Sequence, residues 1–177
     1  VIFWAADFFE RVVGLPKNYA AAAVSAYFAA NVLGRAVGSR LTRSHSPEAL
    51  LLLSVSIAVI GFPIFWLSSV PIFNTLGLFL TGLGISNLYP LLLSLVTRTV
   101  PNQSDKASAR ISMAMGLAIL ITPQILASFA DQVGIYRAYT IVIILLATLL
   151  VLTIVGNQLV KRQHASSSFE QDPIKSL

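Results

Sequence analysis

The chain has 177 residues, of which 56% are hydrophobic and only 11% are charged, and it carries a formal net charge of +5. Soluble domains contain about 25% charged residues, so this composition argues against a water-soluble domain. Cysteine is absent, which excludes disulfides and thiolate metal sites. The two histidines lie in polar connections, and nothing pairs them into a metal-ligand set.

The first element in chain order is the apolar segment 1–14, whose composition is helix-like. It has no charged leader and no small-residue cleavage site, so it is not a signal peptide. A bilayer core about 30 Å thick requires a helix of roughly 20 residues, which this segment does not reach. Because the chain also begins without Met, we expect a partial membrane helix cut from a longer protein.

Three side chains of this segment are candidates for a site. Asp7 and Glu10 lie three residues apart on one helix face, and an ionisable group at the bilayer centre costs about 2.5–3.5 kcal/mol. Either they face a wet cavity as a substrate or proton site, or Asp7 pairs with Arg11 four residues further on. Trp4 either anchors a ligand ring or is ordinary apolar packing.

The predicted helix 18–38 carries two rows of residues at helical spacing. One row consists of small residues, which let helices approach closely in lipid: Ala22, Ala26, Ala30, Gly34 and Gly38. The other row is polar and consists of Tyr27, Asn31 and Arg35. The polar row either lines an aqueous path, or its first two members bond across helices while Arg35 extends to the interface.

No charged side chain occurs between Ala49 and Thr97, a run long enough for two spans. The first span, 49–68, is almost uniformly apolar, and we expect it to face lipid at the periphery. The second, 71–97, begins with a proline and measures about 40 Å at 1.5 Å per residue. It contains three glycines and Pro90. Either it bends at Pro90 and acts as a hinge, or these residues are simply common in membrane helices.

Polar residues cluster beside this proline. Ser86, Asn87 and Tyr89 immediately precede Pro90, and a helix bend frees carbonyls and exposes nearby polar groups. They either line a cavity or form ordinary interhelical hydrogen bonds.

The last two predicted spans are 108–130 and 137–160. The first has a small-residue row at Ser108, Ser112 and Gly116, and Gln124 next to a proline is a weaker cavity candidate. The second is almost uniformly apolar, and we expect it at the periphery. The remaining segment, 161–177, is polar and Ser-rich, which predicts a disordered tail.

The basic residues separate by side if the predicted helices alternate in direction. Nine of them fall on one side: Arg35, Arg40, Arg43, Arg98, Lys106, Arg110, Lys161, Arg162 and Lys175. The other side has Arg11, Lys17 and Arg137. This bias predicts an integral protein of the plasma (inner) membrane with the Arg-rich side and the C-terminus in the cytoplasm. Topology thus explains the net charge, and nucleic acid is not expected as a partner.

Three local patterns resemble the major facilitator superfamily. The segment 34–43 resembles the second copy of its cytoplasmic Gly/Arg loop motif, whose matching positions are Gly34, Arg35, Gly38, Arg40 and Arg43. Thr42 stands where the full motif carries Asp, which speaks against a charge relay here. The segment 81–90 looks like the tenth helix of these transporters. The segments 116–123 and 131–134 are similar to the eleventh helix and its exit loop.

The resemblance implies an all-α, polytopic membrane helix bundle, the C-terminal half of a twelve-helix transporter, with five full transmembrane helices and one partial one. It implies a secondary active transporter working by alternating access, with the N-terminal six-helix half missing. If transport is coupled to protons, the coupling carboxylate is either Asp7 or a residue of the missing half. Its expected partners are the lipid bilayer and a small solute, for which sugars, organic anions and drugs all stay open. The substrate-cavity candidates are Trp4, Asp7, Glu10, Tyr27, Asn31, Ser86, Asn87, Tyr89 and Gln124.

Two rival hypotheses stay open. One is a structural or assembly membrane protein without transport activity, in which the small-residue rows serve oligomer contacts only. The other is an intramembrane enzyme. The sequence contains no metal-ligand spacing, no phosphate loop and no Ser/His/Asp set at membrane depth. We therefore expect no catalytic residues, no metal and no cofactor.

Overall fold

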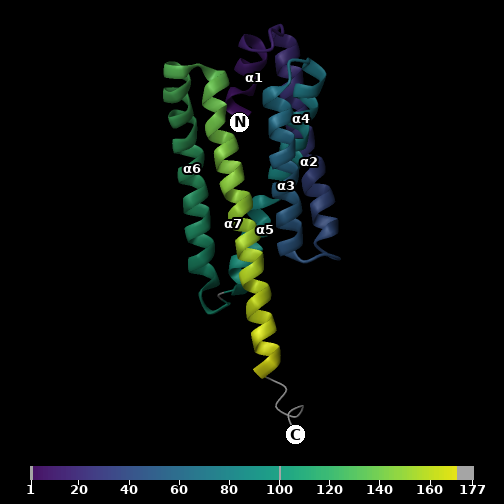
Figure 1. Ribbon diagram of the computed structural model, residues 1–177, viewed down its shortest axis with the longest axis vertical. Coiled ribbons are helices and arrows are strands. Elements are labelled where there is room, and N and C mark those ends of the chain that lie inside the picture. Colours follow the sequence, from purple (N-terminus) through teal and green to yellow (C-terminus); the bar gives the residue numbers. More distant parts are fainter. Residues whose placement is uncertain (1, 100, 171–177) are drawn as a thin grey trace.

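The structure is a computed structural model that describes residues 2–99 and 101–170 (Figure 1). Its elements are α1 (Ile2–Arg11), α2 (Lys17–Leu41), α3 (Pro47–Leu67), α4 (Pro71–Ile85), α5 (Leu88–Thr99), the short 3-10 helix η1 (Pro101–Gln103), α6 (Ser104–Val133) and α7 (Ile135–Glu170). No strand occurs among the described residues.

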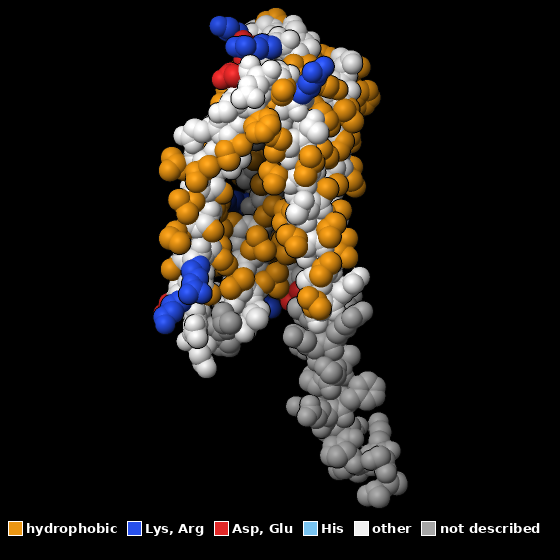
Figure 2. Space-filling model, turned by 60° about the vertical axis from the view of Figure 1, so that its left-hand side comes forward, with side chains coloured by type: hydrophobic (Ala, Val, Ile, Leu, Met, Phe, Trp, Pro, Cys, Tyr) orange, Lys and Arg blue, Asp and Glu red, His pale blue; other side chains and the backbone are white. Residues whose placement is uncertain are grey.

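Within the described part of the chain, five stretches are long and apolar enough to cross a membrane: Lys17–Leu41, Pro47–Leu67, Pro71–Thr99, Ser104–Val133 and Ile135–Leu159. The first helix, α1, has only 10 described residues. The prediction of an all-α membrane bundle with five spanning helices and a shorter first helix is confirmed. The exposed surface agrees with a lipid environment, because Figure 2 shows a mainly hydrophobic face with Lys and Arg gathered near its two ends.

The spanning helices fall into two groups, which are joined by contacts of α5 and α7 with α3. In Figure 1, α2, α3 and α4 lie together on one side, α6 and α7 on the other, and α1 sits at one end of the bundle. The α4 helix packs against both α2 and α3, whereas α6 contacts α5 and α7. The link between the groups is made by α7 against α3 and by α5 against α3 and α6.

Aromatic packing fixes α1 to the rest of the bundle. Phe8 and Phe9 of α1 are fully buried, as are Phe65 of α3 and Tyr139 of α7. The ring of Phe8 lies 4.8 Å from that of Phe65 and 5.3 Å from that of Tyr139, measured between centroids. Tilted aromatic contacts at such distances add to the energy of burial. One face of α1 is therefore held against two spanning helices.

The helices α3 and α4 pack so closely that glycine is required between them. A methyl group at Gly77 would collide with the backbone of Phe65, and one at Gly84 would lie 2.5 Å from the nitrogen of Ala58. Small residues allow such approach, which is how helices associate in lipid. The sequence predicts that this almost uniformly apolar helix faces lipid at the periphery, and this is only partly correct. The α3 helix contacts α4, α5 and α7. Exposed side chains such as Leu53 and Ile60 lie on its remaining surface.

The predicted helix 71–97 is interrupted. The α4 helix ends at Ile85, and α5 begins at Leu88, so Ser86 and Asn87 separate them. Pro90 explains this position, because a proline removes the hydrogen bond to the carbonyl four residues earlier, here that of Ser86. The bend expected at Pro90 therefore appears as a break just before it. The three glycines all lie within continuous α4 and serve packing.

The C-terminal helix is longer than the sequence predicts. The α7 helix continues to Glu170, so residues 161–170 are helical where a disordered tail is expected. The segment after Gly156 contains no proline or glycine up to that point, and an existing helix extends at little cost through residues such as Lys, Arg, Gln and Ala. The rest of the predicted tail, 171–177, lies outside the described residues.

Candidate functional site

The break between α4 and α5 is the centre of the candidate site. The side-chain amide of Asn87 donates to the carbonyl of Gly34 on α2 at 2.7 Å and to the hydroxyl of Ser86 at 3.1 Å. The Ser86 hydroxyl in turn donates to the carbonyl of Leu83 at 2.7 Å. These bonds tie the interrupted backbone to α2 and satisfy polar groups that would be costly to leave unpaired inside a membrane.

Glycines of α2 make this contact possible. A methyl group at Gly34 would collide with the Ser86 hydroxyl, and one at Gly38 would collide with the Asn87 amide. The small-residue row of α2 and the polar cluster before Pro90, which the sequence presents as separate features, therefore meet in one place. The glycine pair of α2, Gly34 and Gly38, therefore contacts the polar two-residue turn between α4 and α5 rather than a continuous helix face.

The polar row of α2 runs along the same interface. Tyr27 and Asn31 are half-buried, and a methyl group at Gly82 of α4 would meet Tyr27 at 3.0 Å. The Asn31 amide lies 3.5 Å from the Gly82 carbonyl, at the outer limit of a hydrogen bond. Arg35 is exposed. The first two residues of this row therefore contact α4, whereas the third, Arg35, lies on an open surface.

Tyr89 connects the site to the second helix group. Its hydroxyl lies 3.0 Å from the Ser112 hydroxyl of α6. This is the interhelical hydrogen bond that the sequence offered as the alternative to a cavity role for Tyr89, and the same holds for Asn87 with Gly34. Gln124, also on α6, is exposed.

The remaining candidates lie at the end of the bundle occupied by α1 (Figure 1). Asp7 forms an ion pair of 2.6 Å with Arg11, and its side chain keeps 28% of its surface exposed. The pairing that was the alternative to a functional Asp7 is therefore present. Glu10 is half-buried, and Trp4 packs against the aromatic cluster. The candidate residues thus form two sets, one on α1 and one at the α4–α5 break.

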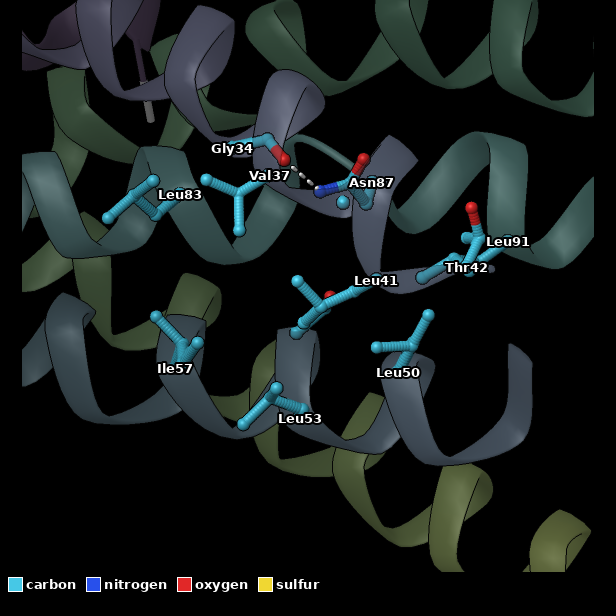
Figure 3. Close-up of a pocket in the computed structure, with 12 residues that line it drawn as sticks. Gly34, Val37, Leu41, Thr42, Leu50, Leu53, Ile57, Leu83, Asn87 and Leu91 are labelled. Carbon is cyan, nitrogen blue, oxygen red and sulfur yellow. Dashed lines mark hydrogen bonds between the residues drawn. The ribbon is translucent and has the colours of Figure 1, made fainter. Parts of the chain in front are cut away.

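Asn87 borders two adjoining pockets. The first has a volume of about 270 Å³ and lies between α2, α3 and the α4–α5 break; it is lined mainly by aliphatic side chains such as Val37, Leu53 and Ile57 (Figure 3). The second has a volume of about 370 Å³, and its lining includes Arg35 and Arg98. Gly38, Thr42, Asn87 and Leu91 line both pockets.

Sequence reasoning missed part of this lining. Ser39, Ser94 and Arg98 line the second pocket, although the sequence offered Arg98 only as a topology signal. A usable signal existed, because Pro90, Ser94 and Arg98 recur every fourth position and so share one face of α5. Among the described residues, no group of three His, Asp or Glu side chains is placed to hold a metal ion.

The family model for the Major Facilitator Superfamily matches residues 1–175. The chain belongs to this superfamily. Comparison with curated proteins and with solved structures found no match. The resemblance drawn from the sequence motifs is thereby confirmed, and this major facilitator chain is an integral membrane protein of the transporter kind. In this superfamily member, the loop-motif residues Gly34 and Gly38 contact the α4–α5 break directly.

Proposed function

We propose that this chain forms one six-helix half of a secondary transporter that moves a small solute across the membrane by alternating access. The observation that carries the proposal is the break at Ser86 and Asn87, near the middle of the 29-residue span Pro71–Thr99. The interruption is tight, because Ser86 keeps helical dihedral angles and its N–H donates to the carbonyl of Gly82. A bend at membrane depth frees carbonyls and exposes the polar groups beside it. Transporter binding sites are built from such discontinuous helices near the bilayer midplane.

The solute path in this proposal follows the polar side of α2 and α5. Tyr27, Asn31 and Arg35 descend along α2, and Asn87 and Ser94 lie on the facing segment. The other wall belongs to a second six-helix half, which is the proposed partner. Alternating access then consists of a rocking of the two halves around the path. Flux of solute through this 177-residue chain alone would contradict the need for a partner.

Cysteine labelling tests the path directly, since the chain contains no cysteine of its own. Ser94→Cys and Tyr89→Cys should react with a membrane-impermeant thiol reagent several-fold faster than Leu152→Cys, whose side chain is 63% exposed on the outer surface of α7. A purely structural membrane protein predicts that all three react equally slowly, because each thiol would then face lipid or protein.

The proposed orientation places the α2–α3 connection and the C-terminus in the cytoplasm of a plasma-membrane protein. The basis is the distribution of Lys and Arg. Ser44→Cys, exposed in that connection, should be labelled by an impermeant reagent only after the cells are opened. Labelling of Ser44→Cys in intact cells would show that the orientation is the reverse of the proposed one. It would not affect the interpretation of the labelling test at Ser94.

A further inference from the structure

The second pocket described above concentrates positive charge. Arg35 of α2 and Arg98 of α5 both line it, together with the hydroxyl-bearing residues Ser39, Thr42 and Ser94. The guanidinium group presents several N–H donors in a rigid fork that matches the geometry of phosphate and carboxylate. Two such groups with neighbouring hydroxyls form a donor-rich site suited to an oxyanion.

This charge lacks a counter-ion in the part of the chain that the structure describes. None of the residues that line the pocket is Asp or Glu. The one ion pair among the described residues joins Asp7 and Arg11, on α1. Two like charges facing one pocket repel each other, so an anion from outside the described bundle would stabilise this arrangement.

Both arginines of the pocket lie toward the same end of the bundle. Arg98 is the penultimate residue of α5, and Arg35 lies six residues before the end of α2 at Leu41, which corresponds to about 9 Å. Arginine side chains near helix ends extend to the membrane interface. Basic pockets between transmembrane helices bind anionic headgroups in several membrane proteins.

An apolar groove adjoins the charged pocket. Figure 3 shows Val37 and Leu41 of α2 opposite Leu53 and Ile57 of α3, with Leu83 toward one end of the groove and Leu91 toward the other. Val37 and Leu53 are about half exposed, at 52% and 48%, so the groove is open to the surroundings. Because Thr42, Asn87 and Leu91 line both pockets, the groove and the charged pocket meet at the α2–α5 contact.

We infer that the two pockets together bind one anionic amphiphile, a molecule with a phosphate or carboxylate head and a hydrocarbon chain. The head lies between Arg35 and Arg98, and the chain lies in the aliphatic groove between α2 and α3. The groove is open to the surrounding leaflet, whose phosphatidic acid and phosphatidylglycerol have this chemistry, so the proposed occupant is an anionic lipid of that leaflet. The inference does not depend on transport, because binding alone is the readout.

Lipid retention by the protein in nanodiscs tests the head site. Native mass spectrometry would measure bound phosphatidylglycerol for the unchanged protein, for Arg35→Gln/Arg98→Gln, and for Arg40→Gln/Arg43→Gln. The last variant removes the same number of charges from the same end of the bundle, at exposed residues outside both pockets. Loss of charge-assisted hydrogen bonds predicts affinity about tenfold or more weaker for the first variant and nearly unchanged affinity for the second.

Equal weakening by both double variants would overturn the inference, since it would indicate general attraction of anionic lipid to a basic surface. Arg35→Lys/Arg98→Lys keeps the charge but loses the guanidinium fork, and it should retain part of the binding. This variant also guards against misfolding. If the folded Arg35→Gln/Arg98→Gln variant retains lipid as well as the unchanged protein, other contacts hold the lipid and the head site is wrong.

A second arm separates binding of an amphiphile from binding of a free anion. Dodecyl phosphate should compete with phosphatidylglycerol, whereas inorganic phosphate should not at the same concentration, because it lacks a chain to place in the groove. Leu53→Ala should weaken dodecyl phosphate binding, and Leu152→Ala, a matched exposed leucine on α7, should not. Competition by inorganic phosphate at the same concentration, or equal effects of the two leucine variants, would show that the groove does not bind a hydrocarbon chain. Either result would overturn the inference that the ligand is an amphiphile.

Discussion

The α3–α4 pair and the α6 helix all belong to stretches apolar enough to cross a membrane, but they have opposite surroundings. Where α3 meets α4, glycines bring the two backbones together and a large share of both helices is buried. On α6, almost the whole helix is exposed, including Met113 and Leu120 at 64% each. A methyl group at Gly116 of α6 would meet no atom within 4 Å. In lipid, exposure of apolar side chains carries no cost, so small residues matter only where a partner helix is present.

Gly84→Ala and Gly116→Ala should therefore have opposite effects, and this is the largest expected difference. At Gly84 the added methyl overlaps the backbone of α3. Overpacking a core costs about 1–3 kcal/mol, so the free energy of unfolding should fall by this amount or more. At Gly116 the same change has space and favours the helix by up to about 1 kcal/mol. Thermal unfolding in one detergent measures both, and a loss of stability at Gly116 would indicate a helix packed there.

Asn74→Leu tests how much the hydrogen bonds of a buried side chain stabilise the α3–α4 pair. The buried Asn74 amide donates to the carbonyls of Phe65 at 2.6 Å and Ser68 at 3.0 Å, at the end of α3. Leucine would leave both carbonyls without this donor, which should cost about 1–3 kcal/mol. Gln124→Leu, at an exposed position of α6, is the matched control and should change the stability by less than about 0.5 kcal/mol.

Tyr89→Phe tests the hydrogen bond between the two helix groups. Removing the hydroxyl that lies 3.0 Å from that of Ser112 should cost about 0.5–1.5 kcal/mol. A double-mutant cycle with Ser112→Ala isolates the pair, and the second change should then have little further effect. Additive losses would show that the two hydroxyls act independently.

Asp7→Asn should have the smallest effect on stability. Its partner Arg11 is 74% exposed, and an ion pair at a wet surface contributes about 0–1 kcal/mol. The informative measurement is solute flux by the complete transporter at several pH values. A proton-coupling carboxylate predicts that Asp7→Asn abolishes the pH dependence of flux. Unchanged flux and pH dependence would remove Asp7 from the mechanism and leave it as the partner of Arg11.

Particular residues show how far sequence reasoning extended into the site. Small residues at every fourth position marked Gly34 and Gly38 as contact positions, and the cluster before Pro90 marked Ser86 and Asn87. Nothing in the sequence indicated that these two features contact each other, because helical periodicity does not relate residues that lie on different helices. Arg98 was visible only as a charge on one side of the membrane.

Hydropathy was sufficient to predict that lipid surrounds this protein and to predict the number of spans, and the superfamily was predicted from a resemblance of local motifs that the family model confirmed. These are local properties, since a span is defined by its length and its transfer free energy into lipid alone. Only the tertiary structure decided which glycines face a partner, where the long helix breaks, and that Arg35 and Arg98 face one pocket. Such features depend on how the helices are rotated relative to one another. Lipid solvates every apolar helix face equally, so composition does not indicate which face of a helix meets a partner.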